Sequence, residues 1–111
     1  MATYLTKFSH TPETWARLLA SPEDRRNVLS PVIEAMGGKL HGYWYAFGDA
    51  DGFVLFDAPD DVAAGTLLVK VASTGAFTNV STTKLLTVEE ALEVMRRGGA
   101  TEYRAPGAPG S

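Results

Sequence analysis

One stretch of the sequence, residues 37–56, limits the fold more than any other part of the chain. It begins with Gly37 and Gly38, which suit a helix end because glycine adopts the left-handed cap conformation without strain. An alternating, aromatic-rich run follows, and the glycines and aspartates of residues 48–52 are typical of a tight turn. Residues 53–56 are all apolar, which predicts a second strand that is more central than the first. The stretch therefore predicts a helix end followed by a β-hairpin.

Alternation within this hairpin assigns side chains to the two faces of its first strand. One face collects the odd positions: Lys39, His41, Tyr43, Tyr45 and Phe47. The even positions, which include Trp44, fall on the other face because side chains alternate along a strand. We therefore expect His41 to share a face with Tyr43 and Tyr45, and Trp44 to point the opposite way.

Strand and helix signals alternate along the rest of the chain. Alternation over residues 3–9 and 77–86 predicts two more strands, and the second is polar enough for a sheet edge. Helix starts, in which a capping residue precedes proline or acids, are predicted at residues 11–13, 21–24, 58–61 and 87–90. The last helix is expected to turn its apolar residues inward, namely Val88, Ala91, Leu92 and Met95.

The order of these elements predicts an α+β fold. Strand, helix, strand, strand, helix, strand and helix, joined by right-handed connections, give a ferredoxin-like split βαβ with a four-stranded antiparallel sheet, helices on one face and an extra C-terminal helix. This domain is expected over residues 1–104, and the Pro/Gly-rich residues 105–111 read as a disordered tail. Because one sheet face would be bare, we expect a two-fold homodimer that packs sheet on sheet.

The composition of the chain argues against several classes of binding partner and metal site. The 111 residues carry a formal net charge of −3, which argues against nucleic-acid binding, and they include no cysteine, which excludes disulfides and thiolate metal sites. No apolar run is long enough to span a membrane, and residues 1–4 do not begin a signal peptide, so we expect a cytoplasmic location and no membrane partner. No cofactor is expected, and two distant histidines do not suggest a structural zinc site.

Four segments resemble the GYD domain family: residues 37–40, Gly42-Tyr43-Trp44, residues 48–52 and residues 88–92. The resemblance extends to about Tyr103, and Ala50 stands where the family usually has an aromatic residue. The GYD family is similar to the dimeric α+β barrel proteins, a group that includes cofactor-free monooxygenases, haem-handling proteins, lactone isomerases and aldoxime dehydratase-like enzymes. The resemblance therefore implies a dimeric α+β barrel fold and leaves the activity open.

The candidate site residues come from the hairpin. His41 can act as a general base because its ordinary pKa lies near neutrality, and Tyr43 or Tyr45 can polarise a substrate oxygen. Four further residues are expected to contact a ligand: Tyr4, Trp15, Trp44 and Asp57. We expect one cavity per subunit, between the sheet and its helices, into which His41, Tyr43 and Tyr45 point. The competing set is Trp44 with helix residues such as Trp15, which would be ordinary core. The alternative is that His41 simply bonds a neighbour and that the aromatics form core and dimer interface.

Other polar residues have simpler interpretations. His10 lies after the first strand, where a loop histidine can be catalytic but is more often solvated. Asp49 and Asp51 are explained by turn chemistry.

Taken together, these features favour a small dimeric protein that binds a small aromatic ligand. It would act either as a cofactor-free monooxygenase, isomerase or lyase with His41 as base, or as a non-catalytic binding or structural module. A haem-binding form of that module would use His41 as ligand.

Overall fold

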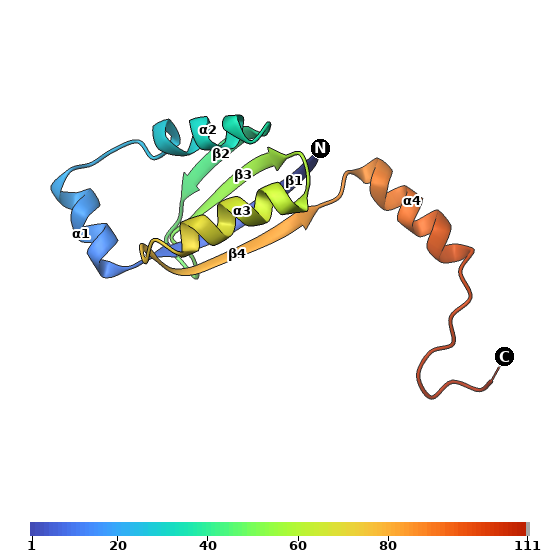
Figure 1. The fold of residues 1–111 in the computed structure, drawn as a ribbon. Helices are drawn as coiled ribbons and strands as arrows, with labels where there is room; N and C mark the ends of the chain where they lie inside the picture. Colours follow the sequence, from blue (N-terminus) through green and yellow to red (C-terminus); the bar gives the residue numbers. More distant parts are fainter. Residues whose placement is uncertain (111) are drawn as a thin grey trace.

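Four strands form one antiparallel sheet, in the order β2-β3-β1-β4, within the residues that the structure, a computed structural model, describes: residues 1–110 (Figure 1). The strands are β1 Ala2–His10, β2 Lys39–Tyr45, β3 Gly52–Ala58 and β4 Phe77–Leu85. The helices are α1 Pro12–Ala20, α2 Arg26–Ala35, α3 Asp61–Ala72 and α4 Val88–Gly99. The α+β, ferredoxin-like fold predicted from the sequence is confirmed.

The predicted strand positions are also confirmed. The apolar strand β3 lies between β2 and β1, and the polar strand β4 lies at the edge beside β1. An interior strand must be apolar on both faces when both become covered, whereas an edge strand tolerates polar side chains. The polarity of the sequence therefore predicted the interior position of β3 and the edge position of β4 correctly.

Local capping explains where the helices start and stop. The Thr11 side chain accepts a hydrogen bond from the Thr14 backbone N–H at the start of α1, and Asp60 caps α3 in the same way. Thr87 and Glu90 form a reciprocal capping box at the start of α4. Gly37 has a φ of 87° just after α2, which only glycine adopts readily.

A β-bulge at His41 changes the faces of β2. Leu40 pairs with Phe56, but the next paired residue, Gly42, is opposite Leu55, so His41 is one extra residue in its strand. Alternation therefore slips by one position at this point. His41 points to the same side as Asp57, whereas Tyr43 pairs with the buried Val54. The expectation that His41 shares a face with Tyr43 and Tyr45 is wrong.

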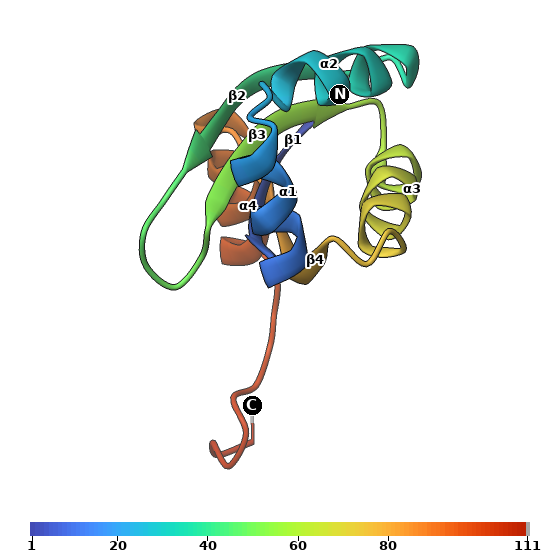
Figure 2. The same cartoon turned by 90° about the vertical axis from the view of Figure 1, so that its left-hand side faces the viewer.

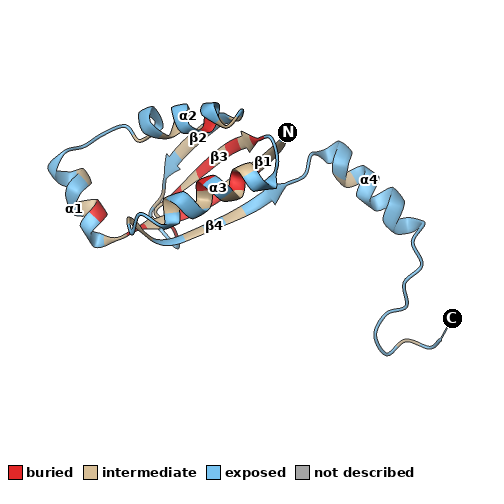
Figure 3. Cartoon of the chain, in the orientation of Figure 1, coloured by how far each residue is buried: buried red, intermediate tan, exposed pale blue. Residues whose placement is uncertain are grey.

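The core lies between one side of the sheet, here called the helix face, and helices α2 and α3 (Figure 2). Tyr4, Phe8, Val54 and Phe56 project from the sheet toward Ile33 of α2 and toward Ala64 and Leu67 of α3. The buried segments gather in this layer, while the outer surfaces of the helices stay exposed (Figure 3). The opposite side, here called the open face, carries no helix of the described chain.

Helix α4 lies away from the sheet, beyond the end of β4 (Figure 1). None of its residues is buried, and Val88 and Met95 are 72% and 66% exposed. The expectation that its apolar residues face inward is therefore wrong for a single chain, because α4 has no surface of its own subunit to pack on. No described helix is long and apolar enough to cross a membrane.

The predicted tail follows α4. Residues 105–110 contain no helix or strand, and Ser111 lies outside the described residues. The structure does not test whether this tail is disordered, so the division into residues 1–104 and 105–111 stays a prediction.

Candidate ligand cavity around His10

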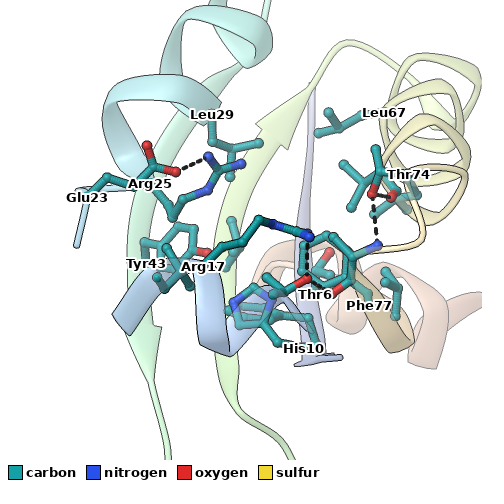
Figure 4. Close-up of a pocket in the computed structure, with 18 of the residues that line it drawn as sticks. Thr6, His10, Arg17, Glu23, Arg25, Leu29, Tyr43, Leu67, Thr74 and Phe77 are labelled. Atoms are coloured by element: carbon teal, nitrogen blue, oxygen red, sulfur yellow. Dashed lines mark hydrogen bonds and ion pairs between the residues drawn. The ribbon is translucent and has the colours of Figure 1, made fainter. Parts of the chain in front are cut away.

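A cavity of about 450 Å³ lies between the helix face of the sheet and the surrounding helices (Figure 4). Most of its apolar wall residues come from the sheet and from the two helices that cover it: Phe8, Leu29, Val54, Phe56, Leu67, Leu68, Val71, Phe77 and Val80. Polar side chains also line it: Thr6, His10, Thr14, Arg17, Ser21, Glu23, Arg25, Tyr43 and Thr74. An apolar pocket of this size with a few convergent polar groups is typical of small-molecule sites.

His10, the last residue of β1, is the most unusual of these polar groups. Its side chain is largely enclosed, with 6% of the residue exposed. Three aromatic rings surround the imidazole: the ring centroids lie 5.1 Å from Phe8, 5.0 Å from Trp15 and 4.9 Å from Phe77. Neither Nδ1 nor Nε2 has a hydrogen-bond partner among residues 1–110. Buried polar atoms in proteins normally have partners, so this pair of nitrogens requires an explanation.

The nearest backbone acceptor is already shared by two other donors. The Ala76 carbonyl oxygen already accepts from the Thr11 backbone N–H at 3.0 Å and from the Thr14 hydroxyl at 2.9 Å. A carbonyl has two lone pairs, and both are used here. Burial lowers the pKa of His10, and the nearby Ala76 carbonyl offsets this only in part. The lowered pKa favours the neutral form of the imidazole, which carries one donor and one acceptor nitrogen.

Asp51 fixes this end of the cavity. Its carboxylate Oδ2 accepts from the His10 backbone N–H at 2.8 Å and from the Trp15 indole Nε1–H at 3.1 Å. The turn between β2 and β3 is thus tied to the end of β1 and to α1. Turn chemistry alone, as expected from the sequence, does not explain Asp51, because its partners lie 41 and 36 residues away.

The two tyrosines of β2 take different positions. Tyr43 lines the cavity, with its ring centroid 5.5 Å from Phe8, and burial is the main cause that raises the pKa of its hydroxyl. Tyr45 is 47% exposed and lies beside the cavity, its ring centroid 5.5 Å from Tyr43 and 6.0 Å from Trp15. The structure therefore brings Tyr43, Tyr45 and Trp15 together with His10.

His41 lies on the open face instead. Its Nε2 is 2.8 Å from Asp57 Oδ2, and the Thr3 hydroxyl donates to Asp57 Oδ1 at 2.6 Å. The Thr3 bond, and then His41, hold the pKa of Asp57 below its usual range. As a haem ligand, His41 would have to give up this contact with Asp57 or coordinate through Nδ1. The described residues contain no group of three or more His, Cys, Asp or Glu side chains able to hold a metal ion.

Trp44 is also on the open face and is 52% exposed. Its ring covers Gly42, where an added Cβ would lie 2.3 Å from the ring. The interpretation of Trp44 and Trp15 as a shared core is therefore wrong, because the sheet separates them.

Tyr4 belongs to the core rather than to the cavity wall. Its ring stacks on Phe56 with centroids 5.4 Å apart, and its hydroxyl donates to the Asp61 carboxylate at the start of α3. This bond is the main cause that raises the pKa of Tyr4 to about 12. Of the seven residues predicted for the site, only Tyr43 lines the cavity. Trp15 and Tyr45 lie next to lining residues, through ring contacts with His10 and Tyr43, and the other four do not line it: Tyr4, His41, Trp44 and Asp57.

Sequence reasoning gave His10 little weight. A histidine at the end of a strand has no local signal of burial, since Trp15, Phe77 and Asp51 enclose it from three other segments. The sequence signal that could have indicated burial was the position of His10 directly before the Thr11 cap, because the cap fixes the direction in which α1 leaves the sheet.

Comparisons with known proteins agree with the fold. The chain is similar to a solved structure described as "crystal structure of FFRP-DM1", with a TM-score of 0.50 and 15% sequence identity over 78% of this chain and 100% of that one. At this identity the likeness concerns the fold alone. No curated protein matches the sequence. The family comparison matches the GYD domain over residues 4–95, so this chain belongs to the GYD domain family.

Proposed function

We propose that this protein binds a small, flat, largely apolar ligand in the cavity around His10. The observation that carries the proposal is the enclosed imidazole of His10, a residue that lines the apolar cavity and whose two ring nitrogens are buried without hydrogen-bond partners among residues 1–110. An unmet buried donor or acceptor costs roughly 1–3 kcal/mol, and a chain gains nothing from this arrangement by itself. A ligand that accepts from one nitrogen or donates to the other removes that cost.

The aromatic lining favours a flat ligand. Phe8, Phe77 and Tyr43 present rings to the cavity, and offset or edge-on contacts between rings add stability beyond the buried area. The same geometry supports cofactor-free acid–base chemistry. His10 is neutral near pH 7 and can take up a proton from a bound substrate, and the Tyr43 hydroxyl can orient an oxygen. We propose His10 as the base of such a reaction.

The sequence-based candidate for the base, His41, stays a prediction and gives a direct comparison. We would titrate the protein with 2-naphthol, whose hydroxyl both donates and accepts, and measure affinity by calorimetry. His10→Ala is expected to weaken binding at least tenfold, while the matched variant His41→Ala leaves it unchanged. Loss of binding in His41→Ala with retention in His10→Ala would reject the proposal in favour of the hairpin histidine. Circular dichroism checks that both variants fold.

The non-catalytic, haem-binding alternative has its own measurement. If His41 binds haem, the protein with added haem gives a Soret band that is lost in His41→Ala. We expect no such loss, because Asp57 holds the Nε2 of His41. We also propose a cytoplasmic location, which rests on the sequence alone.

We also propose that the protein is a homodimer. The open face carries Leu5, Phe53, Leu55 and the half-exposed Trp44, and the described chain leaves it uncovered. The radius of gyration is 18.5 Å, whereas a compact chain of this length has about 13 Å. The difference reflects α4 and the residues after it, which extend away from the domain (Figure 1).

Charge supports a second copy as the partner of both surfaces. On α4, Glu93 pairs with Arg96 and Arg97, which leaves Glu89 and Glu90 in its first turn as the acids available to a partner. The open face offers Lys7 and Lys39. We propose that two open faces pack together about a two-fold axis and that each α4 covers the partner subunit. Light scattering after gel filtration is expected to give a dimer. Leu92→Glu should shift it toward monomer, and Val69→Glu, on an exposed position of α3, should not.

A further inference from the structure

The cavity has two unlike ends, and they restrict the chemistry of its ligand. At one end, three polar side chains converge near the Ala76 carbonyl: His10, Thr14 and Arg17 (Figure 4). Thr14 donates to that carbonyl, and the Arg17 Nη2 donates to the Thr14 hydroxyl at 3.3 Å. Away from these groups the lining is mostly aliphatic and aromatic, including Phe56 and Leu67, and the Arg25–Glu23 ion pair lies beside Leu29 (Figure 4).

Arg17 differs from the neighbouring arginines in its pairing. Arg25 is 2.6 Å from the Glu23 carboxylate, and Arg26 is 2.7 Å from that of Asp24. Arg17 has no carboxylate within 4.0 Å among residues 1–110, and its single side-chain bond to Thr14 is long. Its guanidinium therefore reaches the mouth of the cavity with most of its donors free.

We propose that the ligand is a flat, apolar organic acid whose carboxylate lies at the Arg17 end of the cavity, between the guanidinium and the His10 imidazole. This inference rests on the proposed function, since it assumes that the cavity binds a small molecule. Arginine presents a planar fork that matches a carboxylate with two parallel hydrogen bonds. The neutral imidazole donates its N–H to a carboxylate oxygen, which satisfies one of its free nitrogens.

The charge of the lining favours a single negative charge. Arg25 is neutralised by Glu23, which leaves Arg17 as the cation available to a ligand among the described lining residues. A doubly charged phosphate would leave one charge in an apolar surrounding, at a high desolvation cost. The volume of about 450 Å³ accommodates a body about the size of two fused rings.

The test compares 2-naphthoate with 2-naphthamide, which has nearly the same shape and no charge, by calorimetry at pH 7. In the unaltered protein the acid is expected to bind at least tenfold more tightly than the amide. Arg17→Gln should bring the two affinities within twofold, mainly by weakening the acid. The matched control is Arg26→Gln, because Arg26 is also an exposed arginine but does not line the cavity; it should change neither affinity.

A second variant tests whether the probes bind inside the cavity. Val71→Trp introduces a ring at the cavity wall and should weaken both probes, with the fold checked by circular dichroism. Equal affinities for acid and amide in the unaltered protein, or an equal loss of both in Arg17→Gln, would overturn this inference and leave the proposed function standing. Binding of neither probe would overturn both.

Discussion

Replacing Asp51 by alanine tests how the turn organises the cavity. The carboxylate makes two long-range hydrogen bonds, at 2.8 Å to the His10 backbone N–H and at 3.1 Å to the Trp15 indole. Hydrogen bonds to charged groups contribute roughly 1.5–3 kcal/mol each. The backbone bonds of Asp51, to Ala46 and Phe8, do not depend on its side chain and should persist in the variant.

The two losses are not fully additive, because Trp15 is partly exposed and its indole can turn to water. The His10 N–H has less freedom, since it belongs to the end of β1 beside the buried imidazole. We therefore expect Asp51→Ala to lower the free energy of unfolding by about 2–4 kcal/mol. Asp51→Asn, which keeps one neutral acceptor, should lower the free energy of unfolding by less than Asp51→Ala does.

Urea unfolding followed by circular dichroism measures these differences at pH 7. The matched control is Asp49→Ala in the same turn, since Asp49 is exposed and should change stability by less than about 0.5 kcal/mol. If Asp51→Ala loses less than about 1 kcal/mol, or no more than the control, the carboxylate does not hold this end of the cavity and the reasoning fails.

Three further predictions follow from single observations. Burial lowers the pKa of His10, so the unfolded chain binds its proton more readily; stability should fall as the pH drops from 7.5 to 5.5, and His10→Gln should remove that fall in urea midpoints. Gly52→Ala places a Cβ 2.3 Å from the Phe8 ring and should cost about 1–3 kcal/mol, while Gly48→Ala, with open space around it, should not. Deleting residues 106–111 should leave the melting temperature unchanged, and a fall of several degrees would show that the tail packs on the domain.

Much of the fold could be predicted because its signals are local. The Thr11, Asp60 and Thr87 caps and the glycine at residue 37 act within one helical turn, so the sequence shows them directly. Polarity also predicted that the apolar β3 is interior and that the polar β4 is at an edge.

The site was harder to predict because its determinants are not local. One extra residue at His41 shifts the alternation of β2, so that His41 lies on the open face and Tyr43 on the helix face. An alternating sequence contains no signal for such a bulge. His10 is enclosed by residues from α1, β4 and the β2–β3 turn, which only the tertiary structure brings together. For α4, the sequence correctly marked an apolar side, but no surface of the described chain covers that side.

The central claim, that the cavity around His10 is a ligand site, has a direct spectroscopic test. The chain has two histidines, so its proton NMR spectrum contains two imidazole C2–H signals, which His41→Asn assigns. During a titration with 2-naphthoate, we expect the His10 signal to shift and saturate while the His41 signal stays in place. Saturable binding that moves the His41 signal, or that leaves the His10 signal unchanged, would contradict the claim.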